Sequence, residues 1–164
     1  MAFRTVSWMD SLLINIEVVS REEANTILAS PGECSKVSFL ISIGAPEDDL
    51  PIGYSNVPDK LRLLFGDTLT AEHGATEADI QCLIDLAKKL TGSSGNILIH
   101  CEAGVSRSPA AALILYTCLL GPGSERKSMD LVLRQRPFAM PNRRMVQLAD
   151  RLLCREGRLM NVLD

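Results

Sequence analysis

The sequence is poor in aromatic residues and histidine, and its cysteines follow no pattern. Aromatic residues make up 4% of its 164 residues and apolar residues 46%, so a core would be built mainly of aliphatic side chains. The five cysteines include no CxxC pair, and the two histidines are not placed to form a metal site. Cys82 and Cys118 lie in apolar helical patterns and are expected to be small core residues. We expect no disulfide framework, metal or cofactor, and free thiols favour the reducing cytoplasm.

Long apolar runs and a strong net charge are also missing. The longest apolar run, from Ala110 to Leu120, is too short to cross a bilayer. Asn15 and Glu17 interrupt the apolar stretch near the N-terminus, which argues against a signal peptide. The net charge of −3 gives no support for binding nucleic acid. The sequence therefore predicts neither a membrane nor a nucleic acid as partner, and its length predicts one domain over residues 1–164.

Positive charge is concentrated near the C-terminus. Between Glu125 and Arg158 there are nine basic and four acidic residues, whereas the rest of the chain is acidic. Solvated helix faces would account for this bias, and so would a basic rim that draws anions toward an active site.

Short apolar segments alternate with amphipathic ones along most of the chain. Apolar runs rich in branched residues predict buried strands at 12–19, 37–43, 61–65 and 97–100. Capping residues and one-sided apolar spacing predict helices at 21–29, between Thr76 and Gly92, and at 108–120, 126–135 and 142–156. The Pro31-Gly32 pair is expected to break the chain after the first helix. This alternation favours a layered α/β domain.

The segment from His100 to Pro109 joins a buried strand to a buried helix and carries the residues needed to hold a phosphate. The first turn of a helix offers unpaired N–H groups and the positive end of the helix dipole. Gly104 lets the backbone curl around a tetrahedral anion, and Arg107 supplies a planar fork of donors for two of its oxygens. The same field favours the thiolate of Cys101, which is the form that attacks. The Ser108 hydroxyl can donate a hydrogen bond to that thiolate when it leaves.

The spacing of Cys101 and Arg107 alone is a weak signal, but the residues around them make it specific. The run from His100 to Ser108 fits HCxxGxxR(S/T), and the chain resembles the cysteine-based protein tyrosine phosphatase superfamily, in the layout of its compact dual-specificity branch. The resemblance covers residues 37–150 and implies a three-layer α/β/α domain around a largely parallel sheet of four to five strands. It implies that Cys101 is the nucleophile and that His100 holds the loop by hydrogen bonds. The implied substrate-binding residues are Glu102, Ala103, Gly104, Val105, Ser106 and Arg107.

A general acid is the remaining requirement, because the leaving oxygen of a phosphate ester needs a proton. The leading candidate is Asp67, which follows a predicted strand closely; in the resembling family the acid lies on such a loop, a few dozen residues before the cysteine. Asp59, Glu72 and Asp79 are rivals, although Asp79 suits the first turn of a helix. The pair Pro141-Asn142 resembles a Pro-Asn of the family, and Asn142 is expected to help fix the loop beside the site.

The loop interior contains no lysine or arginine before Arg107, and Glu102 would repel additional phosphates. In the resembling family, enzymes that act on inositol lipids tend to carry basic residues there. We therefore expect a metal-independent phosphatase that acts on phosphotyrosine and on phosphoserine or phosphothreonine in proteins, or on a small phosphate ester. Two alternatives stay open: a catalytically weak module that captures phosphorylated proteins, and a sulfurtransferase or arsenate reductase with a similar loop.

Overall fold

A sheet of four parallel strands forms the centre of the molecule. The structure is a computed structural model that describes residues 12–164. The strands are β1 (Ile14–Val19), β2 (Phe39–Gly44), β3 (Lys60–Leu64) and β4 (Gly95–His100). Their order in the sheet is β1-β4-β2-β3, so β4 lies inside the sheet, paired with β1 and β2. The predicted largely parallel sheet of four to five strands is confirmed.

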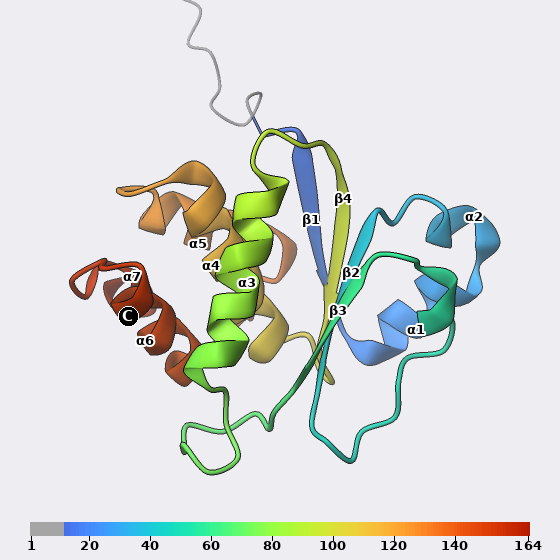
Figure 1. Cartoon of the computed structure of the whole chain (residues 1–164), viewed down its shortest axis with the longest axis horizontal. Coiled ribbons are helices and arrows are strands. Elements are labelled where there is room, and N and C mark those ends of the chain that lie inside the picture. The colour runs from blue at the N-terminus through green and yellow to red at the C-terminus, as the bar shows by residue number, and fades with distance from the viewer. Residues whose placement is uncertain (1–11) are drawn as a thin grey trace, which may run out of the picture.

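Helices cover both faces of this sheet (Figure 1). On one face lie α1 (Arg21–Ala29) and the one-turn helix α2 (Pro31–Cys34). The other face carries α3 (Glu77–Leu90), α4 (Arg107–Leu120), α5 (Glu125–Gln135), α6 (Arg143–Leu152) and the short α7 (Arg158–Asn161). These are the three layers that the sequence predicts. No helix among residues 12–164 is long and apolar enough to span a bilayer.

Successive residues of the strands point to opposite faces and so enter two apolar cores. Ile97 and Ile99 of β4 belong to the larger core beneath α3 to α7, whereas Leu98 packs with Ala24 and Leu28 of α1. Each fully buried aliphatic side chain of this kind contributes about 1.5–3 kcal/mol. Helix α4 is buried from Arg107 to Thr117 and therefore anchors the loop that precedes it.

The helix starts agree with the capping residues in the sequence. Ser20 and Glu23 form a reciprocal capping box at α1, and Thr76 and Asp79 form another at α3. Asn142 caps α6 by accepting a hydrogen bond from the backbone N–H of Met145, 3.1 Å away.

The structure departs from the predictions at three places. Helix α1 ends at Ala29 before the Pro31-Gly32 pair, as predicted, but Pro31 also begins the unpredicted α2, because proline suits the first position of a helix. The last long helix ends at Leu152 instead of residue 156. Cys154 and Glu156 adopt left-handed backbone conformations, with φ values of 53° and 55°, which are incompatible with a continuing α-helix. The short helix α7, which follows, was not predicted. Cys82 is exposed on α3 instead of buried, whereas the half-buried Cys118 does pack against the larger core.

Candidate active site

The loop between β4 and α4 lies at the carboxyl end of the parallel sheet, where ligands bind in open α/β folds. Strand β4 ends at His100 and α4 begins at Arg107, so the loop comprises residues 101–106. Cys101, at its start, is buried with 3% of its surface exposed. Its Sγ atom lies 3.1 Å from the Ser108 hydroxyl oxygen, and the backbone N–H of Gly104 donates to it over 3.3 Å. Two such donors stabilise a negative charge on sulfur.

Three carbonyl groups of this loop are turned outward, because each accepts a hydrogen bond from a backbone N–H of the surrounding chain. The pairs, donor first, are Arg21 with Glu102 (3.0 Å), Met140 with Val105 (2.8 Å) and Asn142 with Ser106 (3.1 Å). In a trans peptide the N–H of the next residue points the opposite way from the carbonyl. The N–H groups of Ala103, Ser106 and Arg107 therefore face the inside of the loop, where they can surround an anion.

Gly104 is required at the tightest point of the loop. Its φ of +70° lies in the left-handed region, which side chains disfavour. A Cβ atom here would approach the backbone nitrogen of Ser20 to 2.8 Å and the carbonyl carbon of Val19 to 2.9 Å. Because these contacts involve backbone atoms, they cannot be relieved by a rotamer change.

Arg107 is fixed by one arm of its guanidinium group. Its Nη1 atom donates to the carbonyl of Phe65 over 2.9 Å, and the side chain is buried. Its Nε atom is buried as well, without a hydrogen-bond partner among residues 12–164. A buried donor without a partner costs about 1–3 kcal/mol, so its retention needs an explanation. The edge formed by Nε and Nη2 suits two oxygens of a phosphate.

Asp67 is held against the loop, as its position in the sequence predicts. Its Oδ1 atom accepts hydrogen bonds from the Ser106 hydroxyl (2.7 Å) and from the Asn142 side-chain amide (2.9 Å). Both bonds reach the same oxygen, which leaves Oδ2 without a partner in the described part of the chain. A proton carried by this carboxyl group would therefore sit on Oδ2, clear of both donors.

The base of the loop is fixed by a chain of hydrogen bonds across three strands. The Arg62 Nη1 atom donates to the Ser42 hydroxyl (2.7 Å), which lies 2.6 Å from Nε2 of His100. The other ring nitrogen of His100, Nδ1, lies 3.1 Å from the carbonyl oxygen of Cys101. Since a carbonyl only accepts, the proton of a neutral ring is on Nδ1. Burial lowers the pKa of His100 to about 4, so the ring is neutral near pH 7.

Comparisons with known proteins rest on structure alone. No protein-family model matches the chain, and neither does any curated protein. Among solved structures, human DUSP28 superposes with a TM-score of 0.63 at 18% identity, over 84% of this chain and 90% of that chain. DUSP15 gives 0.61 at 21% identity, over 90% of both chains. PTPMT1 in complex with PI(5)P gives 0.60 at 14% identity, over 90% of this chain and 94% of that chain.

The chain has the fold of the dual-specificity phosphatases. Within this dual-specificity phosphatase fold, the structure brings together Cys101, Ser108, Arg107 and Asp67, all of which the sequence predicts for the site. Of the predicted loop residues, Glu102 turns its side chain outward and pairs with Arg21, with 3.1 Å between Nε and Oε2. The remaining loop residues surround the site mainly with backbone.

The rival acids are placed elsewhere in this fold. The carboxylate of Asp79 belongs to the capping box of α3, and Glu72 lies exposed beside His73. Asp59 is also exposed, and only its backbone takes part in the sheet: its carbonyl accepts a hydrogen bond from the backbone N–H of Leu40 in β2. Of the four candidates, Asp67 alone accepts hydrogen bonds from the loop.

Two further contributors escape the sequence analysis, namely Ser42 and Arg62. Ser42 stands among apolar residues in LISIG, and Arg62 stands among leucines in LRLL, and this contrast was the available signal in the sequence. Much of the positive charge in the basic C-terminal segment is paired with acidic side chains. Five of its arginines make ion pairs, namely Arg136, Arg143, Arg151, Arg155 and Arg158.

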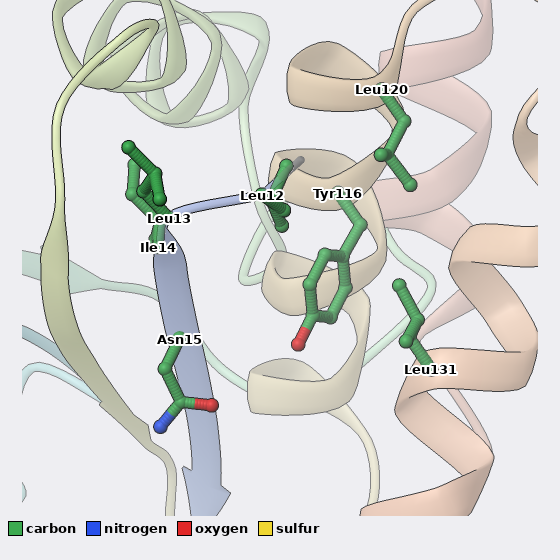
Figure 2. A pocket seen from close by; sticks show the side chains of 7 residues that line it. All are labelled: Leu12, Leu13, Ile14, Asn15, Tyr116, Leu120 and Leu131. Atoms are coloured by element: carbon green, nitrogen blue, oxygen red, sulfur yellow. The ribbon is translucent and has the colours of Figure 1, made fainter. Parts of the chain in front are cut away.

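A hollow away from the loop lies at the N-terminal end of β1 (Figure 2). It has a volume of about 210 Å³, and Leu12, Leu120 and Leu131 contribute to its apolar lining. The Tyr116 hydroxyl points toward β1 and donates to the carbonyl of Ile16 over 3.4 Å. None of the residues that line this hollow is charged, so it lacks a cation to pair with a phosphate.

Proposed function

We propose that this protein is a metal-independent phosphatase that hydrolyses phosphate monoesters in proteins through a cysteinyl-phosphate intermediate. One observation carries the proposal: the Cys101 sulfur, the inward N–H groups and the Arg107 guanidinium belong to one short loop and the start of its helix, and the Asp67 carboxyl is hydrogen-bonded to Ser106 of that loop. The likeness to dual-specificity phosphatase structures supports the same conclusion. The whole chain, residues 1–164, would act as one phosphatase domain, although residues 1–11 lie outside the described residues.

In the first step, the Cys101 thiolate attacks phosphorus while the bond from phosphorus to the ester oxygen breaks. Arg107 and the loop N–H groups compensate the charge on the three equatorial oxygens. Asp67 gives its proton to the leaving oxygen, so an alcohol or phenol departs and a cysteinyl phosphate remains.

In the second step, a water molecule attacks the cysteinyl phosphate and Asp67, now a carboxylate, takes its proton. The sulfur–phosphorus bond breaks, and inorganic phosphate and the Cys101 thiolate are released. The Ser108 hydroxyl, 3.1 Å from the sulfur, donates to the departing thiolate and lowers the energy of this step. His100 stays neutral and holds the loop.

The substrate class follows from the charges around the loop. The loop contains no lysine or arginine before Arg107, and its one acidic side chain, Glu102, is paired with Arg21, so residues 102–106 offer no cation for a second phosphate. PTPMT1, a similar structure, is seen with the inositol lipid PI(5)P, so a lipid headgroup is the natural comparison substrate. Exposed thiols at Cys82 and Cys154 suit the reducing cytoplasm as the place of action.

A substrate panel tests the proposal, with the Cys101→Ser protein as blank. We expect turnover of peptides carrying phosphotyrosine or phosphothreonine, undiminished by EDTA, and slower turnover of inositol phosphates and nucleotides. Tight binding of phosphopeptides without turnover would instead indicate a binding module. Arsenate or thiosulfate chemistry faster than phosphate release would indicate the other class of enzyme.

Replacing the acid should separate substrates by their leaving groups. Asp67→Asn keeps an oxygen that can accept from Ser106 and Asn142, so the loop should keep its shape. We expect kcat for alkyl or phenyl phosphates to fall about 10²–10⁴-fold, the usual contribution of general acid catalysis. Substrates with good leaving groups, such as p-nitrophenyl phosphate, need little protonation and should lose far less.

The control is Glu72→Gln, which removes the rival carboxylate nearest in sequence to Asp67. This side chain is exposed, and its charge contacts only His73 among described residues, over 3.8 Å. Both kinds of substrate should be turned over as before. If Asp67→Asn slowed good and poor leaving groups equally, Asp67 would not be the acid.

A further inference from the structure

Exposed apolar side chains gather beside the candidate active site. Phe138 and Met140, in the segment between α5 and α6, are 89% and 74% exposed, and Val105 of the loop is 39% exposed. A hollow of about 170 Å³ lies between the loop and this segment. Residues 103–105 form one wall and residues 135–139 form the other. Large exposed apolar residues clustered at one place mark a binding surface more often than scattered ones do.

The second wall is fixed relative to the phosphate-binding loop. The backbone N–H groups of Met140 and Asn142 donate to the carbonyls of Val105 and Ser106. At the other end of the segment, the Gln135 side chain accepts from the N–H of Val18 over 3.0 Å. A group held in the hollow would therefore lie at a set distance from a phosphate in the loop.

The size of the hollow suits one side chain. Sites for drug-sized molecules usually measure about 300–1,000 Å³, so a space of about 170 Å³ is small for such a ligand. Arg136 is the one charged residue that lines the hollow, and its two terminal guanidinium nitrogens pair with Glu23, although its buried Nε has no hydrogen-bond partner among residues 12–164. A second phosphate or an anionic membrane would meet acidic as well as basic groups there.

We propose that this hollow binds an apolar side chain next to the phosphorylated residue of a protein substrate. The proposal rests on the phosphatase function above and specifies its substrates: phosphoproteins with Leu, Ile, Val or Met adjoining the phosphorylated position. The phosphate would enter the loop while the neighbouring side chain lies between Val105 and Phe138. Burial of one such side chain is the means of selection.

The test uses two phosphotyrosine peptides of equal length, which carry either Leu or Ser directly before and after the phosphotyrosine. We expect kcat/KM to be on the order of tenfold higher for the Leu peptide, within the range for one apolar group in a pocket. Phe138→Ser should remove this preference and leave p-nitrophenyl phosphate turnover unchanged. The matched control is Leu13→Ser, 66% exposed at the far end of β1 (Figure 2), which should keep the preference.

The outcomes separate this inference from the phosphatase function. Equal kcat/KM for both peptides, or a preference that survives Phe138→Ser, would overturn the inference while turnover of p-nitrophenyl phosphate still supports the phosphatase. If nothing is hydrolysed above the Cys101→Ser blank, the Kd values of the two peptides for Cys101→Ser test the inference without turnover. Tighter binding of the Leu peptide would support it, and equal binding would overturn it. Phe138-dependent sedimentation with phosphatidylserine vesicles, without a peptide preference, would assign the surface to lipid and reject a peptide.

Discussion

Cys101→Ser should abolish phosphatase turnover while the protein still binds phosphate esters. The hydroxyl is a far weaker nucleophile than the thiolate, and loss of a covalent nucleophile lowers kcat by more than about 10⁴-fold. Serine can still accept the hydrogen bonds that Gly104 and Ser108 direct at the sulfur, so the loop should keep its conformation. Steady-state assays with p-nitrophenyl phosphate give the rate, and titration with a phosphotyrosine peptide gives the Kd.

Cys82→Ser is the matched control, because this thiol is exposed on α3 and takes no part in the proposed chemistry. It should retain wild-type kcat and KM. Residual turnover by Cys101→Ser within about tenfold of wild type would mean that another group attacks the phosphate.

The loop could be predicted because its chemistry is local in the sequence. Cys101, Gly104 and Arg107 lie within one strand-loop-helix unit, and the requirements for a small residue, a fork of donors and a helix start all fall within this short stretch of sequence. Asp67 was also predictable, since it follows β3 and parallel strands end at one edge of the sheet. The hydrogen bond that holds Asp67 was harder to predict. Its donor, Asn142, lies 75 residues away in the sequence and is brought to Asp67 by the position of α6.

The support beneath the loop depends on strand register, which the sequence alone did not define. Ser42 lies opposite Arg62 on one side and opposite His100 on the other, so the hydrogen-bond chain exists only in this pairing. A shift of one residue would turn these side chains to other faces.

The wrong prediction that Cys82 is buried has a simpler cause. The buried face of α3 runs through Ile80, Leu83, Ile84 and Ala87, and position 82 lies off that stripe.

Arg107→Lys should lower kcat by about 10²–10³-fold, even though the positive charge is kept. Lysine has no planar fork, so it cannot hold two phosphate oxygens while also donating to the Phe65 carbonyl. The loss corresponds to removing one well-placed donor from a charged transition state. A pre-steady-state assay of cysteinyl-phosphate formation would locate the effect in the first step.

Because Arg107 is buried, its replacement could also disturb folding, and the two effects are separable. Urea unfolding measures the free energy of unfolding of Arg107→Lys directly, and Arg143→Lys provides the control. Arg143 pairs with Asp164 on the surface, so its replacement should change neither stability nor rate by much. A folded Arg107→Lys protein with nearly wild-type kcat would show that point charge, and not the fork geometry, stabilises the transition state. The expected outcome is the reverse, because the buried Nε of Arg107 lacks a partner among residues 12–164, and in the proposed mechanism a phosphate oxygen would supply one.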